Sequence, residues 1–201
     1  MNESVRVVKV GGSLLELADL DTRLRDWLTH QLAAKSIMIV GGGPAVAVVR
    51  EHDRRESLAD AEAHWQAIEA MSANARGLAS RMQEVTRIER LADIERTDGP
   101  IILDVIVDLH ADAASDLPKL PLSWDVTSDS IAAWVAGQVD AAELVLLKSS
   151  LPRNTNIADA VADNYVDRFF VRATSGLLSV RCVNLRDDPF TEKVLLDMPG
   201  N

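Results

Sequence analysis

Short apolar runs recur along the chain and predict buried strands. They cover Val5–Val10, Ser36–Val40, Ile101–Leu109, Glu143–Lys148 and Ser179–Leu185, with a weaker candidate at Phe169–Arg172. Most of these runs are mainly apolar without strict alternation, which is typical of strands that are covered on both faces of a parallel sheet.

Apolar residues at helical spacing lie between the predicted strands. Leucines recur every four residues at Leu24, Leu28 and Leu32. A longer helical face holds Trp65, Ile68, Met71, Ala75, Leu78 and Met82. A third consists of Ile131, Ala132, Val135 and Val139. Strands that alternate with helices predict an α/β protein with a mostly parallel sheet covered on both faces.

The loop-like stretches are short. They are Glu95–Pro100, Ala111–Pro121 and Ser149–Asn156, the last two rich in Pro, Ser, Asp or Asn. None is long enough to link two domains, so we expect residues 1–201 to form a single domain.

Composition narrows the function classes. The net charge of −10 disfavours nucleic-acid binding, which needs a basic face, but it does not disfavour a small anion, whose binding depends on local charge. The single cysteine, Cys182, excludes an internal disulfide and fits a reducing compartment. No long apolar segment stands at the N-terminus and no apolar run reaches about 18 residues, so we expect a cytoplasmic protein without a membrane partner.

Glycine turns follow the first two predicted strands. The first strand ends at Gly11-Gly12-Ser13, and the second ends at Gly41-Gly42-Gly43-Pro44 before the helix-like AVAVVREH. Glycine lets backbone N–H groups converge, and a helix N-terminus favours an anion. Because the carboxyl ends of parallel strands meet at one edge, the turns predict two adjacent anion cradles. The alternative is that both turns are only tight connections; the phosphate-loop patterns GxxxxGK[ST] and GxGxxG are absent.

Lys9 favours the anion-binding interpretation. It lies two residues before the first glycine turn, where its ammonium can reach a phosphate bound at the strand end. The alternative is an ordinary exposed lysine.

A third polar stretch is SWDVTSDSIAAWVAG, Ser123–Gly137. Thr127 or Ser128 fits a helix N-cap, with Asp129 in the first turn. Capping explains one of these residues, but the stretch crowds together Asp125, Thr127, Ser128, Asp129 and Ser130. The alternative is that an acid here positions lysines, or a metal, around a transferring phosphate.

Together these elements resemble the amino acid kinase family, which includes acetylglutamate, uridylate, isopentenyl phosphate and furan-methyl phosphate kinases. The matching stretches are VVKVGGSLL, IVGGGPAV, DVTSDSIAAWVAGQVDAAELVLLK and LSVRCVNL, in the family's order. The compact length and SWDVTSDSIAAWVA look most like the furan-methyl phosphate kinase branch.

The resemblance implies a fold and an activity. The fold is a three-layer αβα sandwich with an open, mostly parallel sheet. The activity is ATP-dependent phosphoryl transfer, with Mg²⁺, to a small-molecule phosphate monoester such as a furan-methyl phosphate in methanofuran-type cofactor biosynthesis. The acceptor would lie on the N-terminal half and ATP on the C-terminal half, in a homo-oligomer.

The resemblance also implies roles for particular residues. Lys9 contacts the transferring phosphate, Asp129 organises the lysines, and Lys148 ends the nucleotide-side strand. The phosphate and substrate contacts come from Gly11, Gly12, Ser13, Gly41, Gly42 and Gly43. The nucleotide side includes Asp125, Thr127 and Ser128.

The chain departs from the family after the nucleotide-side strand. It reads LLKSSLPRN where many members carry a DVDG-type turn that helps to hold ATP. A non-catalytic, ligand-binding protein on the same fold is therefore one alternative. A kinase of an amino-acid carboxylate or of a nucleotide is another.

Other polar and aromatic residues receive structural interpretations. The helix around Trp65–Met82 is expected to cover the acceptor side, with His64, Asn74 and Arg76 off its apolar stripe. We expect His64 to be a surface or satisfied histidine. Solvent contact is the favoured interpretation of Arg50, Arg54 and Arg55. His110 and Cys182 are taken as structural residues of strands, and Trp124 and Trp134 as core. No Cys/His set has metal-ligand spacing.

Overall fold

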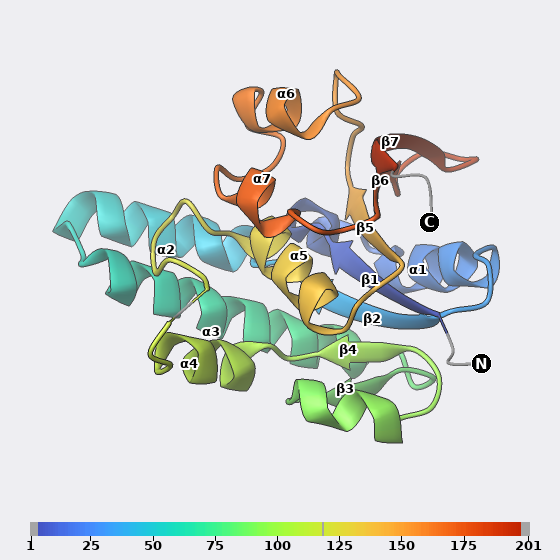
Figure 1. The fold of residues 1–201 in the computed structure, drawn as a ribbon, viewed down its shortest axis with the longest axis horizontal. Helices are drawn as coiled ribbons and strands as arrows, with labels where there is room; N and C mark the ends of the chain where they lie inside the picture. The colour runs from blue at the N-terminus through green and yellow to red at the C-terminus, as the bar shows by residue number, and fades with distance from the viewer. Residues whose placement is uncertain (1–3, 118, 198–201) are drawn as a thin grey trace.

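The computed structural model describes residues 4–117 and 119–197, and its centre is a seven-stranded sheet with helices on both faces (Figure 1). The strand order is β3-β4-β2-β1-β5-β6-β7. In chain order these are β1 (Val5–Val10), β2 (Lys35–Val40), β3 (Thr86–Ile88), β4 (Ile101–Leu103), β5 (Glu143–Lys148), β6 (Ser179–Asn184) and β7 (Thr191–Asp197). The expected αβα sandwich is confirmed.

Seven α-helices and two 3₁₀ helices connect the strands in the described part of the chain. The α-helices are α1 (Leu20–Thr29), α2 (Gly43–Glu56), α3 (Asp60–Ala79), α4 (Ile106–Ala113), α5 (Ser128–Gln138), α6 (Ile157–Ala162) and α7 (Phe170–Ala173). The 3₁₀ helices are η1 (Gly12–Glu16) and η2 (Leu91–Arg96). The start of the chain, 1–3, and Pro118 in the predicted loop 111–121 lie outside the described residues.

Strand β1 is the topological switch point of the sheet. It pairs in parallel with β2 on one side and with β5 on the other, and only β7, at the edge, runs antiparallel. The chain extends the sheet from β1 through β2 toward one edge and later adds β5 on the other side of β1. A crevice is therefore expected beyond the carboxyl end of β1. Lys9 and the first glycine turn lie there.

Two apolar layers cover the sheet. Val8 and Val10 of β1 pack with α1 through residues such as Leu24. Val7 packs on the opposite face, in a layer that includes Ile131 of α5. This division follows from the two-residue period of a strand, which sends successive side chains to opposite faces.

Two predicted strands are wrong in whole or in part. The run Ile101–Leu109 is a strand only as far as Leu103, and Ile106–Ala113 is the helix α4, whose Leu109 is buried at helical spacing. The weaker candidate Phe169–Arg172 falls in the short helix α7, with Phe170 buried.

Several single-residue expectations also fail. Helix α1 ends at Thr29, and Leu32 is 86% exposed. His110 lies on α4, not on a strand, and stacks on Trp65 with 3.8 Å between ring centroids. Trp134 is buried as expected, but Trp124 is only partly buried.

No helix in residues 4–117 and 119–197 has the length and apolar character that a bilayer crossing requires.

Candidate functional site

One carboxylate joins two lysines at the carboxyl edge of the sheet. The Lys9 ammonium lies 2.9 Å from Asp129 Oδ1, and Lys148 Nζ lies 2.9 Å from Asp129 Oδ2. Lys9 and Asp129 are each 5% exposed, and Lys148 is partly buried. We call these three residues the lysine–aspartate cluster. The structure thus brings together the three residues for which the sequence suggests a catalytic role.

Strand periodicity places both lysines on the same face of the sheet. Val7 precedes Lys9 by two residues, and Leu146 precedes Lys148 by two; both apolar residues belong to the layer that packs against α5. Each lysine therefore points toward α5. Lys9 pairs with Leu146 in the β1–β5 register, so the two strand ends lie side by side. The first turn of α5 carries Asp129 to meet them.

The buried charges of the cluster shift the pKa values of its members. Burial lowers the pKa of Lys9, and the Lys148 charge lowers it further, although Asp129 opposes both effects. Burial would raise the pKa of Asp129, but the two lysines together bring it below its usual value. Within the cluster one carboxylate contacts two ammonium groups, and the nearby Asp167 carboxylate, which also raises the pKa of Lys9, is engaged by the start of α5. Two ammonium groups at one edge of the sheet can bind an incoming anion.

Tyr165 holds Lys148 from the other side. Its backbone carbonyl accepts a hydrogen bond from Lys148 Nζ, and its ring centroid is 4.4 Å from that ammonium. The Tyr165 hydroxyl donates to the Ser150 carbonyl at 3.0 Å. The lysine is thereby fixed by contacts from two directions. Cys182 is also buried near this site, and burial raises the pKa of its thiol to about 11, so the thiol stays protonated at neutral pH.

Asp167 caps the helix that carries Asp129. Its Oδ2 accepts from the Thr127 N–H at 2.9 Å, the Thr127 hydroxyl at 2.7 Å and the Ser130 N–H at 3.1 Å. The Ser130 hydroxyl donates to Oδ1. Burial and the nearby Asp129 charge raise the pKa of Asp167, while these hydrogen bonds oppose the rise. Asp167 thus supplies the side-chain hydrogen bonds at the helix start, whereas the Asp129 carboxylate, also in the first turn, contacts Lys9 and Lys148.

Sequence reasoning missed Asp167. It lies in the stretch DNYVDRFF, 37 residues after the nearer of its partners. Nothing in that stretch indicates which helix it contacts. Thr127 is the N-cap residue of α5, as expected, but the capping carboxylate comes from elsewhere in the chain.

The two glycine turns pack against each other. A Cβ added at Gly12 would lie 2.4 Å from the Gly43 nitrogen, so only glycine fits there. Gly43 itself has a φ of +53° and begins α2, where its N–H has no partner within the helix. Asn74 of α3 donates to the carbonyls of Gly41 and Gly42, both at 2.9 Å. These contacts place the backbone of both turns beside the N-terminus of α2.

The glycines differ in whether their backbone N–H groups already donate to a carbonyl of a neighbouring strand. Gly11 donates to Leu147 at 2.8 Å and Gly41 donates to Val10 at 2.9 Å, so both continue the strand ladders. Gly12, Gly42 and Gly43 line the pocket described below and remain the candidates for anion contacts.

Two predicted residues lie apart from the lysine–aspartate cluster. Ser13 is exposed and its hydroxyl lies 3.0 Å from that of Ser149, which links the first glycine turn to the end of β5. Asp125 is exposed beside Arg168, with 3.7 Å between their charged atoms. Ser128 is buried and lines the pocket.

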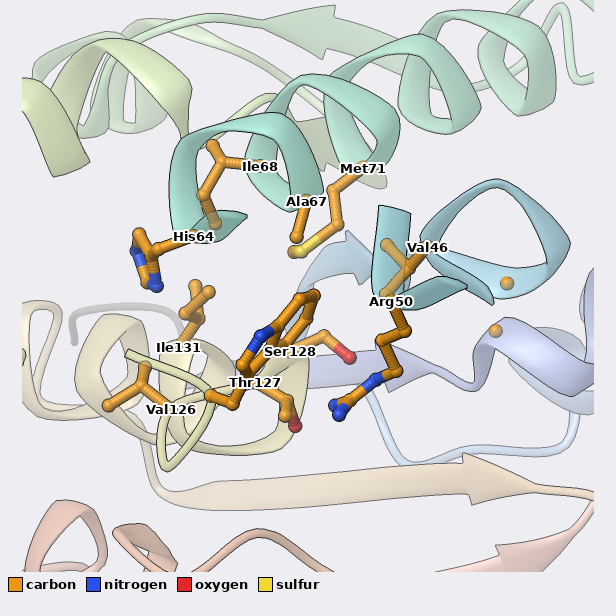
Figure 2. A pocket seen from close by; sticks show the side chains of 14 residues that line it. Val46, Arg50, His64, Ala67, Ile68, Met71, Val126, Thr127, Ser128 and Ile131 are labelled. Atoms are coloured by element: carbon orange, nitrogen blue, oxygen red, sulfur yellow. The ribbon is translucent and has the colours of Figure 1, made fainter. Parts of the chain in front are cut away.

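A pocket of about 220 Å³ opens beside the glycine turns (Figure 2). It lies between α2, α3 and the start of α5. Its lining consists of Gly12, Gly42, Gly43, Val46, Arg50, His64, Ala67, Ile68, Met71, Trp124, Val126, Thr127, Ser128 and Ile131. No carboxylate is among these residues, and Arg50 is the one side chain that carries a permanent charge. The pocket is therefore mainly apolar with a cationic contact.

Trp124 lines this pocket, so its assignment to the core is wrong. Its indole N–H donates to Asp53 Oδ2 at 2.7 Å, and the Arg50 guanidinium lies 4.0 Å from the ring centroid. Both partners belong to α2. Arg50, Arg54 and Arg55 are all exposed, as expected, but they differ in their contacts. Arg50 also lines the pocket, whereas Arg54 pairs with Glu51 on the same helix.

Arg76 takes part in a second buried acid cluster. Asp104, at the end of β4, accepts from the Ser72 hydroxyl at 2.7 Å and from Arg87 at 3.2 Å. Arg76 donates to Ser72 at 2.7 Å and lies 3.6 Å from the Asp104 carboxylate. These contacts join α3 to β3 and β4, and they account for Arg76 without a ligand.

Comparison with solved structures shows kinases of one fold. The chain is similar to UMP kinase from Ureaplasma parvum with a TM-score of 0.65 and 14% identity, covering 98% of this chain and 100% of that one. Aspartate kinase from Synechocystis gives a TM-score of 0.63 and 14% identity, covering 98% of this chain and 41% of that one. UMP kinase from Bacillus anthracis gives 0.60 and 15%, covering 92% and 88%. No family model and no curated protein matches the chain.

These similarities establish that the chain has the fold of UMP kinases and aspartate kinase. The fold is the one that the resemblance to the amino acid kinase family implies. At such identities the similarity carries the fold alone, and the chemistry has to be argued from the site.

Proposed function

We propose that this protein is an ATP-dependent kinase whose acceptor is a small phosphate monoester, such as a furan-methyl phosphate in methanofuran-type one-carbon cofactor biosynthesis. The observation that carries the proposal is the lysine–aspartate cluster beside two glycine turns at the sheet's switch point. The acceptor occupies the pocket on the N-terminal half, and ATP binds on the C-terminal half, beyond β5.

Enzymes catalyse phosphoryl transfer mainly by positioning the reactants and stabilising charge, with little covalent chemistry by the protein. An oxygen of the acceptor phosphate attacks the γ-phosphorus of ATP, and the bond from that phosphorus to the bridging oxygen breaks, leaving ADP. Lys9 and Lys148 face the oxygens that carry the developing charge. Asp129 holds both ammonium groups in place before ATP arrives, so little reorganisation is needed during the reaction.

The pocket favours an acceptor that is already an anion. An alcohol acceptor would need a base to take its proton. Among the described residues near the pocket, Asp129 is held by two lysines and Asp167 by four donors, so neither carboxylate is free for that task. The His64 imidazole also lines the pocket, but it lies on the side opposite Arg50, away from the proposed phosphate end (Figure 2). A phosphate oxygen is ionised at neutral pH and needs no base.

The apolar walls disfavour the other acceptors. An amino acid such as aspartate carries three charged groups and little apolar surface, whereas Arg50 is the one permanently charged side chain among the lining residues. A nucleotide carries a polar base and ribose, whereas Val46, Ile68 and Met71 form much of the wall. A compact ring with one phosphate, held by the glycine turns and Arg50, matches these groups better.

Magnesium fits this site as a partner of the nucleotide. No group of three or more metal-binding side chains occurs in the described part of the chain, and the two nearest carboxylates are already engaged. Mg²⁺ commonly keeps several waters and binds through substrate phosphates. When bound, it would supply positive charge at the ATP phosphates, and Lys9 and Lys148 would supply it from the protein.

The test is an ADP-release assay with the full chain, ATP, Mg²⁺ and three acceptors: furan-methyl phosphate, UMP and aspartate. We expect acceptor-dependent ADP release with the furan-methyl phosphate, and a kcat/KM at least tenfold lower with the others. Preference for UMP or aspartate would instead favour a nucleotide or amino-acid kinase. A protein that binds ATP without releasing ADP with any of the three would support the non-catalytic alternative.

A further inference from the structure

A buried histidine occupies the end of the pocket away from the α2 wall. His64, on the N-terminal half of α3, is 3% exposed and lines the pocket. Figure 2 shows it on the opposite side of the pocket from Val46 and Arg50. The expectation of a surface or satisfied histidine is therefore wrong about exposure and half correct about hydrogen bonding, because the ring is buried and the protein engages only Nδ1 in the described residues.

The hydrogen bond of Nδ1 fixes where the proton lies on the ring. His64 Nδ1 is 3.4 Å from the Ser123 carbonyl oxygen, which can only accept. This contact is a hydrogen bond when Nδ1 carries the proton, and in that tautomer of the neutral ring Nε2 carries the lone pair. Burial lowers the pKa of His64, so the ring is neutral at pH 7.

The surroundings hold this ring in one orientation. Trp65 meets it edge-on, with 5.5 Å between ring centroids and an interplanar angle of 85°. Trp65 is itself stacked on His110 at 3.8 Å. The nearby pocket walls come from Ile68, Val126 and Ile131, which have no side-chain donor. Within the described residues no donor pairs with His64 Nε2, so a ligand is free to do so.

We propose that His64 is a specificity-determining residue whose Nε2 accepts a hydrogen bond from a hydroxyl or amine at the end of the acceptor opposite its phosphate. This inference rests on the proposed function. The glycine turns and Arg50 define the phosphate end of the pocket, and His64 adds a single polar contact at an otherwise apolar far end. An acceptor without a donor there would leave Nε2 desolvated and unpaired.

The first experiment tests the ring without any ligand. Nitrogen-15 NMR of the full chain, with His64 assigned by comparison with His64→Gln, distinguishes a protonated ring nitrogen from one with a free lone pair. At pH 7 we expect Nδ1 protonated and Nε2 unprotonated. A proton on Nε2 would overturn the inference and leave the proposed kinase function untouched.

The second experiment compares three furan-methyl phosphates that differ only at the ring carbon farthest from the phosphate arm. That carbon carries a hydroxymethyl, an aminomethyl or a methyl group. The unmodified protein should favour at least one donor-bearing compound over the methyl compound by about tenfold in kcat/KM, the scale of one hydrogen bond. Equal use of all three contradicts the inference, and transfer to none of them overturns both the acceptor class and the inference.

Matched variants separate this contact from a structural role. His64→Leu should lose the preference while still using the methyl compound, and His64→Gln, whose side-chain oxygen reaches a similar position, should retain part of it. His52→Leu, at an exposed position on α2, is the control and should behave like the unmodified protein. If His64→Leu fails to fold, the comparison of His64→Gln with the unmodified protein still decides the question. A loss of activity in His64→Gln that is equal for all three compounds would indicate that His64 has only a structural role.

Discussion

Asp129 is the residue that both lysines of the cluster share, each at 2.9 Å. Its carboxylate compensates two ammonium groups that would otherwise repel each other in a largely buried place. Capping of α5 is performed by Asp167, so the charge of Asp129 is available for the lysines. The effect of removing that charge can therefore be separated from the effect of weakening the helix.

We expect Asp129→Asn to lower turnover by an order of magnitude or more. The substitution preserves shape and a carbonyl oxygen but leaves Lys9 and Lys148 without a counter-ion when phosphate is absent. Their positions should loosen before ATP binds. Measuring kcat and circular dichroism on one preparation checks this, with α5 expected to remain folded. A variant with nearly full activity would remove Asp129 from the phosphoryl-transfer site.

The pKa of Lys9 predicts the alkaline limit of activity. Burial and the Lys148 charge hold that pKa below the ordinary 10.5, so Lys9 should lose its proton, and the enzyme its activity, as the pH rises through a value below 10.5. Asp129 raises the pKa of Lys9, so Asp129→Asn should move this limb to still lower pH. Profiles of kcat/KM against pH for both proteins test the sign. An unshifted alkaline limb would mean that another group controls it.

At the scale of elements, the two glycine turns act as one unit because their backbones touch. A Cβ at Gly12 would lie 2.4 Å from the Gly43 nitrogen, and backbone cannot move aside cheaply. The approach of these turns brings the N-terminus of α2 beside the end of β1. Substitutions here should affect both stability and the placement of the phosphate contacts.

Gly12→Ala should destabilise the fold by about 1–3 kcal/mol, as expected for overpacking, and reduce activity as well. Gly77→Ala is the matched control, since a Cβ there meets nothing within 4 Å and the helix α3 should gain roughly 0.5–1 kcal/mol. Urea unfolding and kcat/KM of both variants decide the matter. Equal stability of the two alanine variants would contradict the close approach of the turns.

Helix α2 forms a wall of the pocket although none of its side chains is fully buried. It packs against α3 and is joined to the opposite wall through Trp124, which donates to Asp53 at 2.7 Å. Arg50 lies against the same indole ring. The position of this wall should therefore depend on a few polar contacts.

Asp53→Ala should raise KM for the acceptor by about three- to tenfold, because one hydrogen bond contributes roughly 0.5–1.5 kcal/mol. The kcat should change little, since the lysine–aspartate cluster is not touched. Glu51→Ala removes only an exposed ion pair with Arg54 on the same helix and serves as the control. If the two variants have the same KM, the contact with Trp124 does not position the wall.

For the molecule as a whole, the sequence predicted those strands and helices that have a clear local pattern of apolar residues. The strands at Val5–Val10 and Glu143–Lys148 match at both ends. The first is rich in valine and stops at a glycine pair, and the second is a leucine- and valine-rich run that begins and ends with a charged residue. The strand predicted at Ile101–Leu109 extends too far. Its second half, IVDL, has apolar residues at helical spacing, but the same residues are also compatible with a strand. Strand β7 was missed because Thr191, Glu192 and Lys193 make its first half polar at the edge of the sheet.

Contacts between distant segments lay beyond sequence reasoning. Lys9 and Asp129 were each marked by a local motif, and the fold brings them together. Asp167 and Trp124 have no local motif for their roles, because their partners lie 37 to 71 residues away. Such residues become visible only when the packing of helix against sheet is known.

The central claim is that the lysine–aspartate cluster transfers a phosphoryl group from ATP to a phosphate monoester. The most direct measurement is phosphorus-31 NMR of furan-methyl phosphate incubated with ATP, Mg²⁺ and either the unmodified protein or Lys9→Met. With the unmodified protein we predict two new coupled signals from a diphosphate ester, appearing as ATP is converted to ADP. The Lys9→Met protein should form them about a hundredfold more slowly or worse, as expected when a preorganised charge is lost. Equal rates of product formation by the folded Lys9→Met and unmodified proteins, or no diphosphate ester from either, would contradict the account.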